Sequence, residues 1–172
     1  MKIAISGGAS QGKSTLVNAL KDETIFKDYL FLTNLTRNLQ QQGIPINENG
    51  TTVTQLHVML KHYERLNQGD NVVLDRSALD GLAYSMYFYD KIDLPFRSVI
   101  TKMFEAMIYS YDRLFYITPE LPLVEDGERS VNREFFNAVN INFENIIRDY
   151  NLNIIRLTGT VSDRIEQIKN NL

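Results

Sequence analysis

The chain of 172 residues contains no cysteine and only two histidines, His57 and His62. The absence of cysteine excludes disulfide bonds and thiolate zinc sites, and two histidines are too few for a multi-histidine metal centre. No apolar run approaches the roughly 20 residues that a membrane-spanning helix needs, and the N-terminus does not resemble a signal peptide. We therefore expect a cytoplasmic protein without a membrane partner.

The chain also has no excess of positive charge, since its formal net charge is -3. Broad binding to nucleic acid needs clustered positive charge, so the acidic balance argues against it, although a local basic cleft remains compatible with the sequence. The hydrophobic content of 44% is enough for a core, and the length is about that of one domain. We expect residues 1–172 to form a single domain.

A complete phosphate-binding motif lies close to the N-terminus. Residues 7–14 read Gly-Gly-Ala-Ser-Gln-Gly-Lys-Ser and fit the P-loop pattern G-x-x-x-x-G-K-[ST]. A β-branched run precedes the motif and a helical pattern follows it. Glycine lets the main-chain N–H groups turn toward phosphate oxygens, and the helix start adds a positive dipole end. Lys13 is expected to reach the β- and γ-phosphates, and the Ser14 hydroxyl to ligate Mg²⁺.

Strand-like and helix-like segments alternate along the chain. The expected strands are residues 2–6, 29–33, 71–75, 112–117 and 153–157. The expected helices are residues 13–21, 35–43, 52–67, 78–90, 96–111, 131–149 and 161–171. This alternation predicts an α/β fold in which a parallel sheet is covered by helices on both faces.

Three of the expected helices carry apolar groups with alternative roles. Helix 52–67 has a stripe at helical spacing that is expected to face the core, formed by Val53, Leu56, Leu60 and Tyr63. Helix 96–111 is expected to be buried, or else to line a pocket, through Met103, Phe104, Met107, Ile108 and Tyr111. An aromatic cluster can cover the core or stack on a flat ring, and it consists of Tyr84, Tyr87, Phe88 and Tyr89.

A second pattern with chemical meaning ends the third expected strand, where Asp75, Arg76 and Ser77 follow an apolar run. In a P-loop fold, an Asp at the C-terminal edge of the sheet lies beside the phosphate loop. Asp75 can hold a Mg²⁺-bound water or accept a proton from an attacking hydroxyl. Arg76 can clamp a phosphate of the acceptor, and Asp80 is a further candidate. The alternatives are that Asp75 caps the next helix and that Arg76 pairs with a surface carboxylate.

The segment 118–133 is expected to form a lid over the site. Two prolines and a glycine keep its first part from being helical. Arg129 and Arg133 are four residues apart, so on one helix they would project from the same face and neutralise charge on the transferring phosphoryl group. The alternative is a solvated loop. Arg37 follows the second expected strand and is either a grip for the phosphate acceptor or a solvated helix residue.

Together, the P-loop, the strand ending in Asp75-Arg76-Ser77 and the segment 118–133 resemble the P-loop nucleoside and nucleotide kinases. The pattern is most similar to compact kinase-like ATPases related to the ribosylnicotinamide kinase domain and to phage deoxynucleoside monophosphate kinases. The resemblance implies a three-layer fold with a five-stranded parallel sheet. It also implies ATP with Mg²⁺ as the donor and transfer of the γ-phosphate to a small nucleoside-type acceptor.

The resemblance also assigns roles to residues of this chain. Phosphate binding falls to Gly8, Ala9, Ser10, Gln11, Gly12, Lys13, Ser14 and Thr15. Asp75 becomes the catalytic or metal-linked carboxylate, and Arg129 and Arg133 become lid arginines. With the residue-based expectations, the catalytic candidates are Lys13, Asp75, Arg129 and Arg133, and the metal-linked ones are Ser14 and Asp75. The substrate-binding candidates Arg37, Arg76 and Asp80 rest on their positions after the strands, not on the resemblance.

One segment departs from the family pattern and leaves the acceptor open. A Glu-x-x-Arg pattern is common near the end of the second strand, but this chain has Asn-Leu-Thr-Arg at residues 34–37. The leading function is phosphorylation of a nucleoside or a (deoxy)nucleoside monophosphate. The alternatives are phosphorylation of a hydroxymethylated pyrimidine in DNA and a non-kinase nucleotide-binding ATPase or switch module. The Asn-Lys-x-Asp tetrapeptide of GTPases does not occur. A homodimer is left open.

Overall fold

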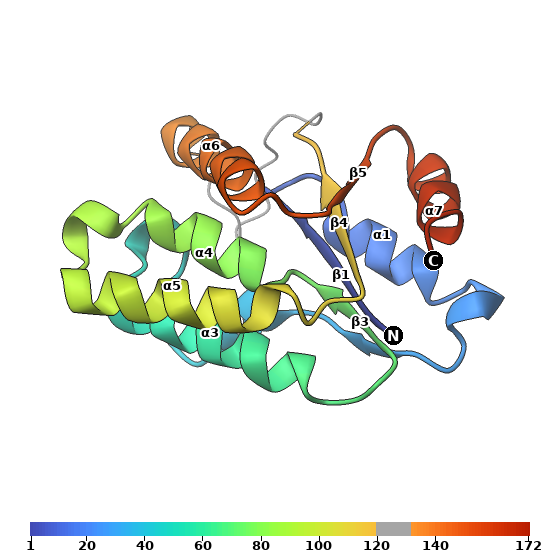
Figure 1. Cartoon of the computed structure of the whole chain (residues 1–172), viewed down its shortest axis with the longest axis horizontal. Helices are drawn as coiled ribbons and strands as arrows, with labels where there is room; N and C mark the ends of the chain where they lie inside the picture. Colours follow the sequence, from blue (N-terminus) through green and yellow to red (C-terminus); the bar gives the residue numbers. More distant parts are fainter. Residues whose placement is uncertain (120–131) are drawn as a thin grey trace.

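The computed structural model describes residues 1–119 and 132–172 (Figure 1). Within these ranges, five strands form one sheet in the order β2-β3-β1-β4-β5. The strands are β1 (Lys2–Gly7), β2 (Leu30–Leu32), β3 (Val72–Asp75), β4 (Arg113–Ile117) and β5 (Ile155–Leu157). All four neighbouring pairs are parallel. The predicted α/β fold with a five-stranded parallel sheet is confirmed, and every strand overlaps its expected range.

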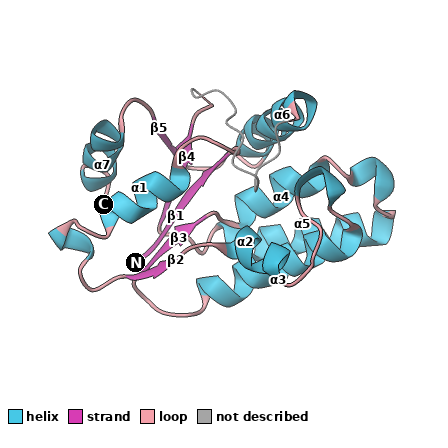
Figure 2. Ribbon diagram, turned by 180° about the vertical axis from the view of Figure 1, so that it is seen from behind, coloured by secondary structure: helices cyan, strands magenta, loops and turns pink. Residues whose placement is uncertain are grey.

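The helices cover both faces of this sheet. They are α1 (Lys13–Leu20), α2 (Leu35–Gln41), α3 (Thr52–Leu66), α4 (Ala78–Met86), α5 (Leu94–Ile108), α6 (Arg133–Asp149) and α7 (Val161–Lys169). In β1, Ile3 and Ile5 belong to the core shared with α1 and α7, whereas Ala4 belongs to the core shared with α3, α4, α5 and α6. The two groups of helices lie on opposite sides of the sheet (Figure 1), and α2 lies beside α3 (Figure 2). The expected three-layer arrangement is therefore present.

The largest differences from the expected helix boundaries are in the helices expected at residues 78–90 and 96–111. The expected helix 78–90 ends at Met86 and is followed by the short 3₁₀ helix η3 (Tyr89–Lys91). Helix α5 begins two residues early because Pro95 lies in its first turn, where no main-chain N–H donor is needed. No helix of residues 1–119 or 132–172 is long and apolar enough to cross a membrane.

In the helix expected at residues 52–67, most of the apolar stripe faces solvent and not the core. Val53, Leu60 and Tyr63 are 62%, 44% and 54% exposed, and Leu56 is only partly buried. The buried residues of α3 are instead Thr54, Gln55, Met59, His62, Arg65 and Leu66. The period was predicted correctly, but the face of the helix that meets the core was not.

The buried face of α3 is polar because it supplies partners at the end of the sheet. Arg65 donates from Nη1 to the carbonyl of Asp75 at 3.1 Å, and from Nη2 to the carbonyl of Leu32. The Oε1 of Gln55 accepts a hydrogen bond from the Ser85 hydroxyl at 3.1 Å. Buried carbonyl groups at strand ends need donors, and an apolar face could not supply them.

The other two apolar groups take structural positions. On α5 and just after it, Phe104, Met107, Ile108 and Tyr111 are buried, and Met103 packs partly buried against the same core. Phe88 is also buried, and Tyr84, Tyr87 and Tyr89 pack against that core. The aromatic cluster therefore covers the core, as one of its two predicted roles required.

Candidate active site

The segment after β1 curls at the C-terminal edge of the sheet. Gly7, Ser10 and Gly12 have φ values of 148°, 59° and 80°, and Gly12 is the N-cap of α1. A Cβ at Gly7 would lie 2.9 Å from the carbonyl oxygen of Ile117, so glycine is needed for the close approach to β4. Of the eight expected phosphate-binding residues, six line a pocket here, namely Ala9, Ser10, Gln11, Gly12, Lys13 and Ser14. Gly8 and Thr15 are not among the described lining residues.

The ammonium group of Lys13 lies inside the curled segment. Its side chain is buried, and Nζ donates to the carbonyl oxygens of Gly7 at 2.7 Å and Gly8 at 2.5 Å. The ammonium group thus lies next to the main chain that forms the pocket wall. Phosphate oxygens are stronger acceptors for this cation than neutral carbonyl groups are.

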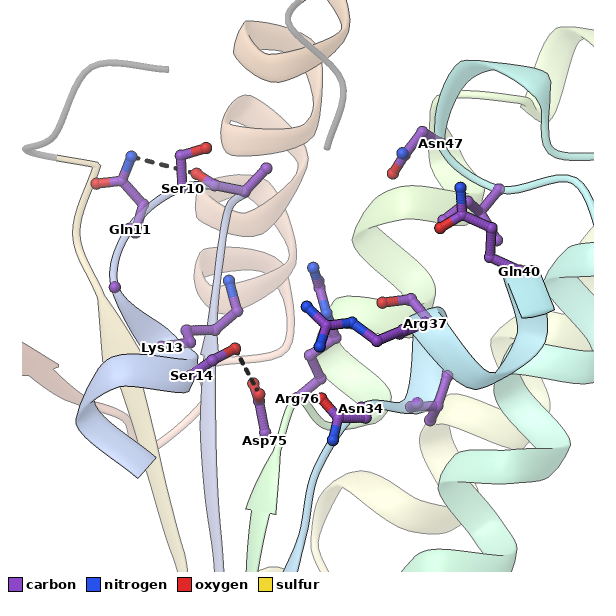
Figure 3. A pocket seen from close by; sticks show the side chains of 15 residues that line it. Ser10, Gln11, Lys13, Ser14, Asn34, Arg37, Gln40, Asn47, Asp75 and Arg76 are labelled. Atoms are coloured by element: carbon purple, nitrogen blue, oxygen red, sulfur yellow. Dashed lines mark hydrogen bonds between the residues drawn. The ribbon is translucent and has the colours of Figure 1, made fainter. Parts of the chain in front are cut away.

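Ser14 and Asp75 come together although they belong to different motifs. The Ser14 hydroxyl donates to Oδ2 of Asp75 at 3.0 Å (Figure 3). The sheet register explains the contact, because Ile5 of β1 pairs with Asp75 of β3 and the P-loop follows β1 directly. The other carboxylate oxygen of Asp75, Oδ1, is buried and has no hydrogen-bond partner among the described residues.

This pair fits one ligand set of a magnesium ion. A buried carboxylate oxygen without a partner, beside a hydroxyl, is a hard oxygen donor of the kind that Mg²⁺ prefers. Within residues 1–119 and 132–172, no group of three or more His, Cys, Asp or Glu side chains could hold a metal. Such a site would therefore take its remaining ligands from phosphate and water, as Mg²⁺ sites in phosphoryl-transfer enzymes do.

Asp75 does not cap the helix that follows it. The Ser77 hydroxyl accepts from the main-chain N–H of Leu79 at 3.0 Å, and Oδ2 of Asp80 accepts from the main-chain N–H of Ser77 at 3.0 Å. Ser77 and Asp80 thus form the capping box of α4. The alternative role of Asp75 as a helix cap is wrong, because its carboxylate is directed toward the P-loop.

Arg76, which is partly exposed, pairs with the buried Asp80. Arg76 has a φ of 74°, which is uncommon for a residue with a side chain, and its Nη1 lies 3.2 Å from Oδ1 of Asp80. Its guanidinium group also lies over the Tyr84 ring, 5.1 Å from the centroid. Arg76 does pair with a carboxylate, but this carboxylate is only 2% exposed and not on the surface. Burial raises the pKa of Asp80, although Arg76 and Lys13 oppose that shift.

Arg37 lies across the pocket from the P-loop. It is carried by α2 and lines the pocket together with Asn34, Gln40 and Asn47 (Figure 3). The structure therefore brings Arg37 and Arg76 onto the same cavity as the P-loop, as the sequence predicted for the C-terminal edge of the sheet.

A second, more apolar pocket adjoins the first. Four residues line both pockets, namely Thr36, Ile46, Asn47 and Arg76. The second pocket is also lined by Thr54, Gln55, Val58, His62, Asp80, Gly81, Tyr84 and Phe88. Sequence reasoning missed Gln55 and His62, because the apolar stripe of α3 pointed to the opposite face of that helix.

Gly81 sets the spacing of the two helices that form this second pocket. A Cβ at Gly81 would lie 2.4 Å from Sδ of Met59 and 3.2 Å from Cδ2 of His62. Because Met59 and His62 belong to α3 and Gly81 to α4, a side chain at this position would require Met59 and His62 to shift.

Most of the expected lid, including Arg129, lies outside the described residues, which omit 120–131. Arg133 is the first residue of α6 and is exposed. It is not among the described residues that line either pocket. The helix begins there because the Asn132 side chain accepts from the main-chain N–H of Phe135 at 3.1 Å. The role of the paired arginines stays a prediction.

Comparisons with known proteins agree with this architecture. A deoxyadenosine kinase from M. mycoides, solved with dCMP and a flexible dCDP as bound products, is 19% identical with a TM-score of 0.71, over 99% of this chain and 97% of that one. The NadR protein in complex with NR is 15% identical with a TM-score of 0.74, and the match covers 98% of this chain and 50% of NadR. At these identities the likeness establishes the fold.

Comparison of the sequence with curated proteins gives no match. The model of the AAA domain family, AAA_28, matches residues 2–164. The family match covers most of the chain, and the fold agrees with the resemblance found in the sequence. The chain belongs to the AAA_28 family of AAA domains, and it has the fold of the P-loop nucleoside kinases.

Proposed function

We propose that the 172 residues act as one ATP-dependent kinase domain that transfers the γ-phosphate to a nucleoside or a (deoxy)nucleoside monophosphate. The observation that carries this proposal is the contact of 3.0 Å between Ser14 and Asp75, in a pocket whose opposite wall carries Arg37 and Arg76. The proteins of similar fold support it, since the deoxyadenosine kinase was solved with dATP and NadR with NAD and AMP-PNP.

The P-loop side of the pocket is the donor site. Main-chain N–H groups of residues 9–14 and the ammonium group of Lys13 hold the triphosphate. Ser14 and Asp75 would hold Mg²⁺, which would neutralise phosphate charge. Of the two roles that the sequence leaves open for Asp75, the hydrogen bond from Ser14 favours the metal-linked one, because a P-loop serine is itself a Mg²⁺ ligand.

The second pocket is the acceptor site. It is mostly apolar, as a site for a nucleobase should be, and it opens onto the donor pocket at Arg76. Arg37 and Arg76 then flank the junction at which the phosphoryl group passes from donor to acceptor. Phosphoryl transfer depends mainly on positioning and charge neutralisation, which these two cations supply.

The test is a comparison of acceptors with labelled ATP. Purified protein is incubated with γ-³²P-ATP and Mg²⁺ and with free nucleosides and deoxynucleosides, ribosylnicotinamide, deoxynucleoside monophosphates, or DNA that contains 5-hydroxymethyl pyrimidines. We expect label on a free nucleoside or nucleotide. Label on the DNA alone would establish the DNA-modifying alternative, and ATP hydrolysis without any labelled acceptor would establish the ATPase alternative.

A further inference from the structure

A buried arginine near the C-terminus reaches the P-loop. Arg164 lies in α7, is 3% exposed, and donates from Nη1 to the main-chain carbonyl of Gln11 at 2.9 Å. The two residues are 153 positions apart, and α7 reaches the loop because it packs against α1. No motif in the sequence includes Arg164.

This hydrogen bond fixes the direction of one peptide group in the loop. In a trans peptide, the carbonyl of one residue and the N–H of the next point in opposite directions. The Gln11 carbonyl points to Arg164, so the N–H of Gly12 points away from α7. Gln11 and Gly12 line the donor pocket, whereas Arg164 is not among its described lining residues. Arg164 therefore contacts the loop from outside the described pocket lining, and the Gly12 N–H points away from Arg164.

The peptide that Arg164 contacts lies in an irregular turn of the main chain. Ser10 and Gly12, on either side of Gln11, both have left-handed φ values of 59° and 80°. Such a turn is outside any helix or strand ladder, so the orientation of its peptide groups depends on specific contacts.

We infer that Arg164 is a positioning residue for the donor nucleotide, because it orients the Gly12 N–H toward the phosphates before they bind. Donors that are already aligned lose no free energy in reorganisation when the ligand arrives. A guanidinium donor makes a charge-assisted hydrogen bond, roughly twice as strong as a neutral one, to the carbonyl that must stay turned away. The inference rests on the proposed function, in that the ligand is a nucleoside triphosphate.

Helix α7 does not need this arginine as its anchor. Its N-terminus has a complete capping box, in which Thr160 and Asp163 bond each other's main-chain N–H groups. Ile168 from the same helix is fully buried in the core shared with α1. A buried guanidinium is unfavourable unless it is well bonded, and an apolar side chain would pack the helix with less desolvation. A guanidinium group at this position supplies a hydrogen-bond donor to the Gln11 carbonyl, which an apolar side chain could not.

The experiment compares ligands with and without a nucleoside part. Dissociation constants for ATP and for inorganic tripolyphosphate, both with Mg²⁺, are measured for the wild type, Arg164→Met, Arg164→Lys and Ile168→Ala. Loss of a charge-assisted hydrogen bond predicts that Arg164→Met weakens both ligands by about tenfold or more. Arg164→Lys keeps a cationic donor and should lie between this variant and the wild type. Ile168→Ala loosens the same helix without touching the loop and should leave both affinities unchanged.

Three outcomes would overturn the inference. These are unchanged affinities in a folded Arg164→Met protein, a loss for ATP but not for tripolyphosphate, and an equal loss in Ile168→Ala. The second outcome would mean a contact with the nucleoside, and the third a general loosening of α7. If Arg164→Met does not fold, Arg164→Lys and Arg164→Gln are judged by the same criteria. A wild type that binds neither ligand would refute the proposed function itself, which is a different result.

Discussion

The two walls of the pocket beside the P-loop are built in different ways. The P-loop wall is one continuous segment, residues 9–14, whose shape follows from glycine and left-handed backbone angles. The opposite wall combines Arg37 from α2 with Arg76 from the turn after β3, and it continues into a pocket between α3 and α4. A wall made of consecutive residues suits a constant group, such as the triphosphate of the proposed donor. A wall assembled from several helices can change its lining residues while the first wall stays the same.

The largest effect that this comparison predicts is at Lys13. Lys13→Ala should lower kcat/KM by about a thousandfold, because it removes the cation that neutralises charge on the phosphates. Circular dichroism and thermal melting should show an intact fold. Lys21→Ala, at the exposed C-cap of α1, is the control and should be fully active. A folded Lys13→Ala protein with full activity would remove the P-loop from the mechanism.

The next effect concerns the link between the walls at Asp75. Asp75→Asn should lower kcat by at least about a hundredfold and change ATP affinity less, because the proposed role of the carboxylate is to hold the Mg²⁺ that neutralises charge on the reacting phosphoryl group. Steady-state kinetics across a range of Mg²⁺ concentrations measure both effects. Asp70→Asn, at an exposed position before β3, is the control. Normal turnover with an unchanged Mg²⁺ requirement would contradict the role of Asp75.

A smaller effect is expected at Arg37, and it tests whether the wall opposite the P-loop binds the acceptor. Arg37→Met should raise the KM of the acceptor by about tenfold, the scale of one charge-assisted contact, with little change in the KM of ATP. The exposed Arg148→Met is the matched control. If the KM of ATP rises together with the KM of the acceptor, Arg37 does not act on the acceptor alone, and the proposed separation of donor and acceptor binding between the two walls is wrong.

The smallest effect is a pH dependence of stability at His62. Burial, with Arg65 and Arg76 nearby, lowers the pKa of His62 well below its ordinary value. The unfolded state then binds a proton that the folded state does not, so stability is complete above about pH 6.5 and falls as the pH decreases through it. The slope approaches about 1.4 kcal/mol per pH unit.

Denaturant unfolding of the wild type and of His62→Leu, from about pH 7 to about pH 5, measures this slope. The free energy of unfolding of the variant should depend less on pH by that amount. His57→Gln, at an exposed position in the same helix, should keep the slope of the wild type. Parallel curves for the wild type and His62→Leu would show that His62 becomes protonated without unfolding.

Features formed by short runs of consecutive residues could be predicted from the sequence, whereas features formed by residues far apart in the sequence could not. The P-loop and the strand ending at Asp75 were predictable because each is a short run whose residue types have direct physical reasons. The buried face of α3 was not, since burial of Arg65 depends on open carbonyl groups at the ends of two strands. Arg164 was not predictable either, because its partner is a main-chain carbonyl 153 residues away.

The tight packing at Gly81 suggests where the second pocket can change its shape. One added methyl group at that position would lie 2.4 Å from Sδ of Met59 and 3.2 Å from Cδ2 of His62, so these two side chains would have to move. Because His62 and Gly81 both line the second pocket, its shape would change while the residues of the P-loop stay in place. Under the proposed division of the two pockets, a change of acceptor would then need only a new contact between two helices.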